Sequence, residues 1–325
     1  MVIIIDEYGV DLAKKNKRFL LRNGEKQQQI SPFRVTAIHV RKACDISSPA
    51  ILLAAEFSIP ILFFNYAGKV KARIWQPYFG SKAEIRRQQL RYSDHQEGMA
   101  WVCARMQDKV AGQIKVLEWL SQRIIGQINN LSLTIEKINH LKTGLLQPAL
   151  KPAEIRVLEA QISKLYWQAY FRTLKKYQSA DKRSRQPAQD PLNSLLNYGY
   201  GMLYGEVEAA VLTAGLDPQT GILHREEYNR PAFVFDAIEP FRPWVDRLVG
   251  EMALSGTIKS TWFDQQPQKV WLSKSGKKEF IPAWYKMINT ATRHKGKRIK
   301  RKDQIQKLMT QLAQYLLNDF KDTPQ

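Results

Sequence analysis

The hydrophobic pattern of the chain changes near residue 82. Before it, β-branched and aromatic residues form four short runs separated by turn residues, and such runs predict strands. One turn, Asn23-Gly24, is typical of a β-hairpin because both residues tolerate positive φ. A single apolar segment, residues 48–57, predicts a short helix capped by Ser48. The four predicted strands span residues 2–5, 19–21, 35–40 and 59–64.

After residue 82 the apolar residues recur at helical spacing, with Lys and Arg on the opposite face. A polar connector at 182–191 and a Gly-Leu-Asp-Pro stop at 215–218 divide this part of the chain. We therefore expect an α+β protein, with a small antiparallel β domain in residues 1–85 and a larger all-α domain in residues 86–325. The predicted helices span residues 82–91, 99–120, 154–177, 192–214, 237–254 and 303–320.

The composition narrows the class of protein. The 325 residues include 50 Lys and Arg against 30 Asp and Glu, a net charge of +20, which favours a polyanionic partner and nucleic acid above all. Only Cys44 and Cys103 are present, which excludes a disulfide scaffold and a cysteine-based zinc site. The N-terminus does not resemble a signal peptide, and the most apolar stretch, 50–66, contains Glu56 and Pro60. We expect a cytoplasmic protein with no membrane partner.

The positive charge is not spread evenly. Residues 190–250 contain four basic and nine acidic side chains, a net charge of −5, inside a chain that is otherwise basic. A metal-dependent nucleic-acid enzyme needs this combination, because basic surfaces hold phosphates while carboxylates hold a cation. On charge alone, an acidic surface helix is the better explanation of the region.

Four residues of this acidic region carry side chains that suit a divalent cation: Glu206, His224, Asp236 and Glu239. Glu206 lies among tyrosines in the predicted helix 192–214, where a carboxylate is costly to bury unless it is paired or binds a metal. Asp236 and Glu239 are three residues apart and would share a helix face. Carboxylates with an imidazole suit Mn²⁺ and Mg²⁺. Taken singly, each residue is better explained as structural, and spacing alone does not decide.

A basic run near the C-terminus is a candidate for phosphate binding. Seven of the ten residues in 293–302 are Lys or Arg. So many positive charges are enough for salt-sensitive, sequence-independent binding to nucleic-acid phosphates. The alternative is a solvated charged segment that leads into the last helix, but the charge of the whole chain favours phosphate. These residues are Arg293, Lys295, Lys297, Arg298, Lys300, Arg301 and Lys302. The chain contains no Walker-type loop, dinucleotide fingerprint or G-x-S-x-G elbow.

Three ordered blocks of the acidic region carry a family resemblance. Residues 190–207 (DPLNSLLNYGYGMLYGEV) resemble the signature helix of the CRISPR-associated integrase family, the larger subunit of the spacer-acquisition complex. Residues 215–224, which end in GILH, are similar to the second block of that family, and 236–243 (DAIEPFRP) resemble its third. More weakly, Glu159-Ala160 before Tyr166-Trp167 resembles a pre-catalytic helix, although the family usually has glycine in place of Ala160.

The resemblance implies a fold and a set of roles. It implies an N-terminal β domain that dimerises and a helical domain with Glu206, His224 and Glu239 as metal ligands and Asp236 as an accessory acid. It also implies homodimers bridged by a small partner subunit, and an activity that joins the 3′-hydroxyls of a short DNA duplex (a prespacer) into a CRISPR repeat with Mg²⁺ or Mn²⁺. Arg242 could contact phosphate or merely begin a helix.

The hypothesis from the sequence is therefore metal-assisted phosphoryl transfer on DNA. Two alternatives stay open. A basic DNA-binding scaffold without chemistry would use the charge alone, and a plain metal-dependent nuclease would use the same residues with water as nucleophile. Only the product, joined DNA or cut DNA, separates the last alternative from integration.

Overall fold

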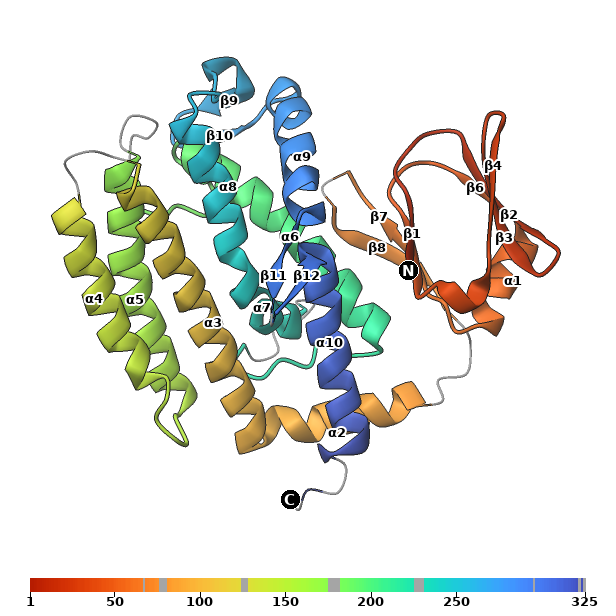
Figure 1. Ribbon diagram of the computed structural model, residues 1–325, viewed down its shortest axis with the longest axis horizontal. Coiled ribbons are helices and arrows are strands. Elements are labelled where there is room, and N and C mark those ends of the chain that lie inside the picture. Colours follow the sequence, from red (N-terminus) through yellow and green to blue (C-terminus); the bar gives the residue numbers. More distant parts are fainter. Residues whose placement is uncertain are drawn as a thin grey trace.

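The structure is a computed structural model that describes residues 1–66, 68–75, 81–123, 128–174, 182–224, 231–294, 296–320 and 323. A β region formed by the first part of the chain lies beside a larger, mainly helical region (Figure 1). The α+β class predicted from the sequence is confirmed. Strands give way to helices between residues 74 and 81, where the hydrophobic period lengthens.

The β region contains two four-stranded sheets, and both are mixed rather than antiparallel as expected. In the first sheet, of order β1-β5-β7-β8, the three strands β1, β5 and β7 run parallel. Helix α1 (Ser48–Glu56) lies between β5 and β7 in the chain and returns it across the sheet, as a parallel pair requires. Between β1 and β5, the chain passes instead through three strands of the second sheet. The strands are β1 (Val2–Ile5), β5 (Ala37–Val40), β7 (Ile61–Phe64) and β8 (Val70–Ile74).

The second sheet has the order β4-β3-β2-β6, in which β2, β3 and β4 are antiparallel and β6 pairs parallel with β2. The hairpin predicted at Asn23-Gly24 is present, with Gly24 at φ +57°. The helix cap is Ser47 rather than Ser48. Buried side chains from both sheets and α1 form one core, among them Phe19, Ile38 and Leu53. The strands are β2 (Val10–Lys15), β3 (Arg18–Asn23), β4 (Lys26–Ile30) and β6 (Asp45–Ile46).

The helical region contains the predicted helices with shifted ends, and elements that the sequence did not predict. The predicted ones are α2 (Ser81–Asp94), α3 (Gln96–Ser121), α5 (Pro152–Thr173), α6 (Pro191–Ala214), α8 (Arg242–Leu254) and α10 (Arg301–Asn318). The helix expected from residue 237 starts earlier, as α7 (Ala232–Ile238) and the 3-10 turn η3 (Glu239–Phe241).

The helical region is also not entirely helical. Two antiparallel hairpins interrupt it, one of strands β9 (Phe263–Gln266) and β10 (Lys269–Leu272), the other of β11 (Ala291–His294) and β12 (Lys297–Lys300). Helices α4 (Ile128–Gly144) and α9 (Lys274–Asn289) are likewise additions to the prediction. The basic run is therefore a β-hairpin followed by the first turn of α10.

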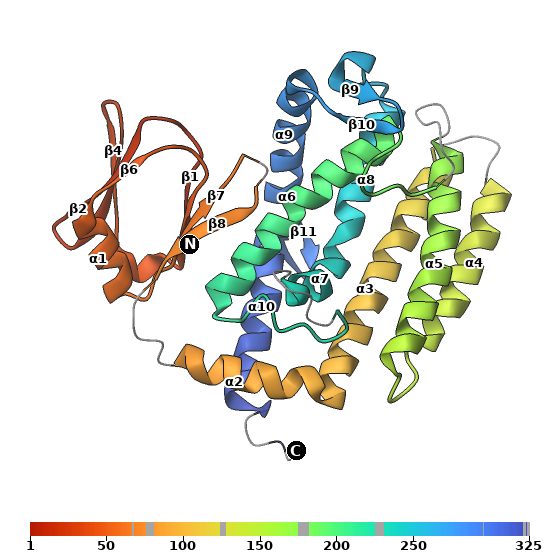
Figure 2. The same ribbon diagram turned by 180° about the vertical axis from the view of Figure 1, so that it is seen from behind.

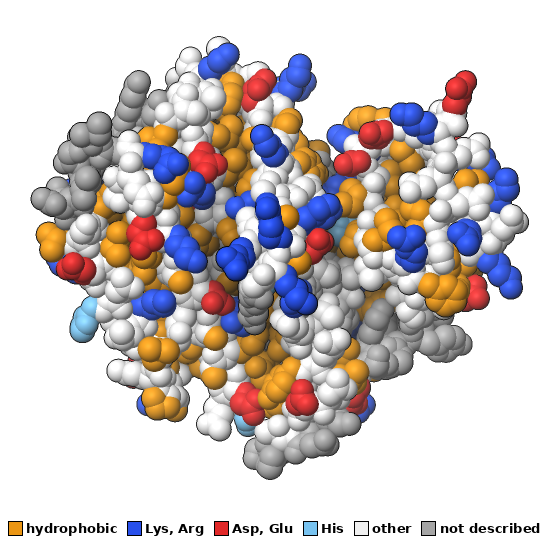
Figure 3. All heavy atoms as spheres, in the orientation of Figure 1, with side chains coloured by type: hydrophobic (Ala, Val, Ile, Leu, Met, Phe, Trp, Pro, Cys, Tyr) orange, Lys and Arg blue, Asp and Glu red, His pale blue; other side chains and the backbone are white. Residues whose placement is uncertain are grey.

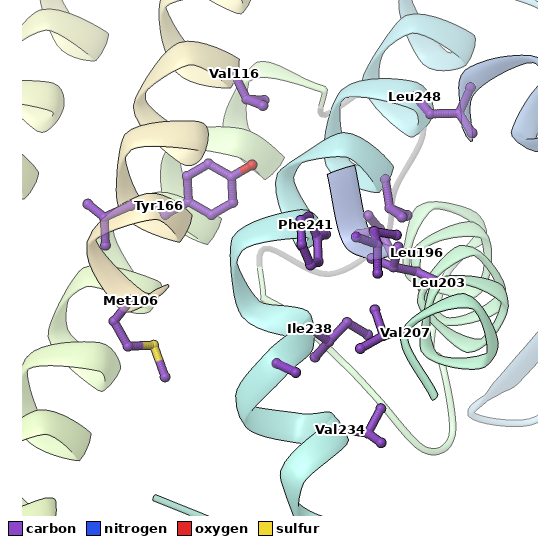
Figure 4. Packing of buried hydrophobic residues seen from close by; sticks show 14 of the residues in the cluster. Met106, Val116, Tyr166, Leu196, Leu203, Val207, Val234, Ile238, Phe241 and Leu248 are labelled. Carbon is purple, nitrogen blue, oxygen red and sulfur yellow. The ribbon is translucent and has the colours of Figure 1, made fainter. Parts of the chain in front are cut away.

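Helix α6 crosses the helical region and organises it. It begins at Asp190, whose side chain accepts a hydrogen bond from the backbone N–H of Asn193 at 2.8 Å, and it ends at Gly215 with φ +86°. Figure 4 shows side chains of α6 facing those of the α7–η3–α8 segment, including Leu203 and Val207 opposite Ile238. This packing fixes where η3, and therefore Glu239, lies.

Helix α10 closes the helical region against α2 and α6 (Figure 1). The hydroxyl of Tyr315 on α10 donates to the carboxylate of Glu97 on α3. Phe320, just after the helix, packs edge-on against Tyr92 of α2 with ring centroids 5.0 Å apart. No helix in the described part of the chain is both long and apolar enough to span a bilayer.

Candidate active site

A short loop before α7 is folded around the carboxylate of Asp236. The side chain of Asp236 is fully buried and accepts hydrogen bonds from the backbone N–H groups of Ile222, Leu223 and His224 at 2.7, 3.1 and 3.2 Å. Its Oδ1 also lies 2.6 Å from Nδ1 of His224. One carboxylate therefore fixes both the loop backbone and the imidazole ring.

Two further contacts hold this loop. The guanidinium of Arg156 on α5 donates to the carbonyl of Leu223 at 2.8 Å, which ties the loop to α5. Gly221 has no room for a side chain, because a Cβ there would lie 2.0 Å from the carbonyl oxygen of His224. His224 is consequently presented from a rigid, tightly packed turn next to α5.

Beside this loop, two carboxylates meet one buried ammonium. Nζ of Lys109, on α3, lies 2.7 Å from Oε1 of Glu159 on α5 and 2.6 Å from Oε2 of Glu239 in η3. Lys109 is 6% exposed and Glu239 only 3%, so water screens these charges poorly. The contact at Oε2 of Glu239 lacks hydrogen-bond geometry, and this buried oxygen has no hydrogen-bond partner.

Arg242 completes the charge pattern around Glu239. Its Nε donates to Oε1 of Glu239 at 2.7 Å, and its guanidinium lies over the ring of Tyr200. Burial alone would raise the pKa of Glu239, but the positive charges of Arg242 and Lys109 lower it to about 2. Glu239 is therefore an anion at neutral pH.

His224 is coupled to the same group of acids. Burial alone would lower its pKa, but the hydrogen bond and charge of Asp236, followed by the charges of Glu239 and Glu159, raise it. Because Nδ1 faces Asp236, Nε2 is the ring nitrogen left for a ligand. Within the described ranges, no three His, Cys, Asp or Glu side chains stand close enough to form a ready-made metal cluster. Lys109 lies where the two glutamates converge.

Glu206 lies elsewhere, at the junction of the two regions. Its Oε1 lies 2.5 Å from Nη2 of Arg41, which follows strand β5, and Nη1 of the same guanidinium donates to the Tyr285 hydroxyl on α9 at 2.9 Å. Arg41 also lies over the ring of Phe64 on β7. Burial alone would lower the pKa of Arg41, but Glu206 and Tyr285 raise it. Glu206 thus joins the helical region to the β region.

The same face of α6 receives the turn between β7 and β8. A Cβ on Gly205 would lie 1.6 Å from the carbonyl oxygen of Gly68 in that turn, so the backbones touch there. Leu62 of β7 packs against Ala209 and Leu212 one turn further along α6. Figure 2 shows β7 and β8 next to α6 and α9. Glu206 therefore faces the β region, whereas Val207 faces the helical core.

The structure therefore groups the sequence candidates differently from the hypothesis. His224, Asp236 and Glu239 come together as predicted, but no contact in the described residues joins Glu206 to them. Glu159 is the acid beside Glu239, although the sequence analysis gave it no role. Its signal was the weak resemblance of Glu159-Ala160 to a pre-catalytic helix.

The predicted phosphate-binding residues lie in and after the β11–β12 hairpin. Arg293, Lys297, Arg298 and Lys300 are exposed, and Arg301 and Lys302 are half-buried at the start of α10. Lys295 lies outside the described residues. Arg293 and Arg298 pair directly across the strands. Figure 3 shows Lys and Arg side chains gathered on this face, over α9, α10 and the hairpin.

Comparison with known proteins places the chain in a family. The family model described as CRISPR associated protein Cas1 matches residues 3–286. The chain belongs to the Cas1 family. A CRISPR-associated endonuclease Cas1 from Archaeoglobus fulgidus is 24% identical over 316 residues, which cover 92% of this chain and 91% of the relative.

Solved structures share the fold over almost the whole chain. A casposase bound to integration product superimposes with a TM-score of 0.77 at 21% identity, covering 99% of this chain and 98% of the casposase. A chain of a partial Cas6-RT-Cas1–Cas2 complex superimposes with a TM-score of 0.76 at 20% identity, covering 98% and 96% of the two chains. The β region followed by a helical region is therefore the fold of these proteins.

Proposed function

We propose that this protein is a divalent-metal-dependent DNA endonuclease and integrase that joins 3′-hydroxyl ends of short DNA into a CRISPR repeat. Membership of the Cas1 family supports the nuclease and integrase class, as does the likeness to a casposase bound to integration product. One observation in the chain itself carries the proposal. Two glutamates from different helices converge beside a histidine that is oriented by a buried aspartate.

The donor set fits a hard divalent cation such as Mg²⁺ or Mn²⁺. The ligands would be Oε1 of Glu159, Oε2 of Glu239, which has no hydrogen bond, and Nε2 of His224. Glu159 takes the place that the sequence hypothesis gave to Glu206, because Glu206 is bonded to Arg41 at the junction. A cation bound there would act as a Lewis acid on a phosphate oxygen.

The chain's own residues prepare this site. Asp236 holds the Nδ1 proton of His224 and so keeps Nε2 directed toward a ligand, which makes Asp236 a positioning residue. Arg242 neutralises Oε1 of Glu239 and keeps that carboxylate ionised. Arg242 would act on the site through Glu239, and a phosphate contact of its own is a prediction that no observation supports.

The β11–β12 hairpin and the start of α10 would hold the DNA backbone. Like charges directly opposite each other destabilise a strand pair, and Arg293 faces Arg298. Such a pair is tolerated where a polyanion neutralises it, and the exposed Lys297 and Lys300 extend the same basic surface. Double-stranded DNA, as prespacer and repeat, is the partner this surface suits.

We also propose homodimers formed through the β region and bridged by a small partner subunit. The support is the family resemblance and the presence of Cas2 in the name of a complex whose chain shares this fold. A binding-only scaffold and a plain nuclease remain the competing functions, and both are outcomes of the experiment that follows.

The test is a strand-transfer assay with a labelled short duplex and a supercoiled plasmid that carries a repeat, in Mn²⁺ or EDTA, with the small partner subunit added. We expect joining by wild type in Mn²⁺ only, none by Glu159→Gln, and joining by folded Glu206→Gln. Loss of joining in Glu206→Gln with retention in Glu159→Gln would restore Glu206 as the ligand. Cut but unjoined DNA would indicate a plain nuclease, and binding without either product a scaffold.

A further inference from the structure

Lys109 is the buried cation that the proposed chemistry does not use. Its ammonium is enclosed within the helical region and contacts one oxygen of each of two glutamates. An ammonium placed between two carboxylates is stabilised in its charged form. Both contacted oxygens, Oε1 of Glu159 and Oε2 of Glu239, are the ones a divalent cation would coordinate.

Two cations cannot share these oxygens without strong repulsion. A carboxylate oxygen that is 2.6–2.7 Å from an ammonium would place a metal ion bound to it within a few ångströms of that ammonium. Like charges at such a separation repel strongly inside a protein, and an ammonium is repelled more by a dication than by a monovalent cation. Lys109 must therefore move before a cation can bind both glutamates.

The structure contains a place for the displaced ammonium. A small enclosed cavity, of about 10 Å³, is lined by Lys109, Gln113, Glu159 and Ser163, together with apolar side chains. Gln113 lies one turn along α3 from Lys109 and is 2% exposed, yet its Oε1 has no hydrogen-bond partner. A buried amide oxygen without a donor is costly, and an ammonium turned toward it would supply one.

We propose that Lys109 is an exchangeable counter-ion: it neutralises Glu159 and Glu239 until a divalent cation binds, and then swings toward Gln113. This inference rests on the proposed cation site and adds a residue that sets its affinity. The exchange makes binding a competition, so the ammonium weakens the site for metal while keeping the buried Glu239 and the half-buried Glu159 paired.

The experiment measures Mn²⁺ binding to the DNA-free full chain by isothermal titration calorimetry. We expect Lys109→Met to bind Mn²⁺ about tenfold or more tightly than wild type, because the competing charge is gone. Lys115→Met, on the exposed face of the same helix, is the matched control and should bind like wild type. Unchanged or weaker binding by folded Lys109→Met would overturn the proposal.

A second variant keeps Lys109 and removes the Gln113 amide oxygen toward which its ammonium would move. Gln113→Leu should weaken Mn²⁺ binding several-fold in the wild-type background and have no effect in the Lys109→Met background. Equal effects of Gln113→Leu in both backgrounds would contradict the exchange. If Lys109→Met does not fold, the wild-type background decides alone, and unchanged or tighter Mn²⁺ binding by Gln113→Leu would overturn the exchange.

The same titration separates this inference from the proposed cation site. If wild type binds Mn²⁺ and Glu159→Gln does not, the site stands, and the Lys109 and Gln113 variants then decide the exchange alone. If Glu159→Gln and Glu239→Gln bind as well as wild type, or if wild type binds no Mn²⁺, the site itself is wrong and the exchange falls with it.

Discussion

The acids Glu206 and Glu239 belong to two groups of paired charges that differ in charge balance. At the junction, one carboxylate, Glu206, meets one guanidinium, Arg41, and a tyrosine hydroxyl accepts a hydrogen bond from the same guanidinium. In the helical region, two carboxylates converge on the single ammonium of Lys109, next to the His224–Asp236 pair. The first arrangement pairs one negative with one positive charge, and Nε of Arg41 has no hydrogen bond there. In the second, three carboxylates accompany Lys109 and Arg242, and Oε2 of Glu239 has no hydrogen bond.

This difference shows how a buried structural acid can be distinguished from a metal ligand. Burial among aromatic residues made Glu206 a candidate, but a buried acid only needs some partner, and a structural arginine is enough. A ligand site is distinguished by more acceptors than cations within one enclosure, together with a histidine whose orientation is fixed. At the proposed cation site, the three carboxylates of Glu159, Glu239 and Asp236 outnumber the ammonium of Lys109 and the guanidinium of Arg242.

The largest effect is expected from a substitution that breaks the Arg41–Glu206 ion pair. Arg41→Met leaves Glu206 buried without its counter-charge, so the free energy of unfolding should fall by about 3–5 kcal/mol. Strand transfer per folded molecule should stay near wild type, because Arg41 touches no residue of the proposed cation site. Urea denaturation measures the first quantity, with the exposed Arg22→Met as control. If Arg41→Met is as stable as wild type, the Arg41–Glu206 ion pair does not stabilise the contact between the two regions.

A smaller effect is expected from the residue that orients His224. Asp236→Asn keeps an acceptor for the loop backbone but weakens the charge that holds the imidazole. Strand transfer should fall about 10- to 100-fold, the usual cost of losing such a partner. The exposed Asp264→Asn is the matched control in the same kinetic assay. Wild-type rates for Asp236→Asn would mean that the loop backbone alone positions His224.

At neutral pH the smallest effect is expected from His39, which lies next to the junction. Burial, then the charges of Arg41 and Lys302, lower its pKa to about 3, so the folded protein keeps this ring neutral. Between about pH 6.5 and 3 the unfolded chain binds a proton that the folded chain does not, and stability is lost as pH falls.

The contribution of His39 should reach about 1.4 kcal/mol per pH unit within that window. His39→Phe should flatten the dependence of the unfolding free energy on pH by that amount, whereas the exposed His140→Gln should not. Denaturation curves at several pH values provide the comparison. Identical slopes for wild type and His39→Phe would assign the acid sensitivity to other groups.

The fold could be predicted where its signals are local. The change from strands to helices follows from the hydrophobic period, and α6 is marked at both ends by Asp190 and Gly215. The parallel order of β1, β5 and β7 depends on pairing between distant strands, which periodicity does not encode. Helix α9 contains Pro282, which disguises its pattern, and in β12 basic residues stand where alternation would mark a strand.

The candidate site likewise has a part that local sequence predicts and a part that only the packing reveals. His224, Asp236 and Glu239 lie within sixteen residues of each other, so one loop and one helix start bring them together and sequence reasoning could group them. The choice between Glu159 and Glu206 was not local, because both are helical acids near tyrosines. Only the packing of α3 and α5 against η3 separates them.

The position of α10 has a consequence for how the chain is made. The ribosome releases the strands of the β region first, and these can pair while synthesis continues. The helices that carry Lys109, Glu159 and Glu239 follow, but their shared core lacks one wall until α10 packs against α2 and α6. A nascent chain would thus complete this shared core only after α10 has emerged, and a chain that stops before α10 would leave the faces of α2 and α6 that contact it uncovered.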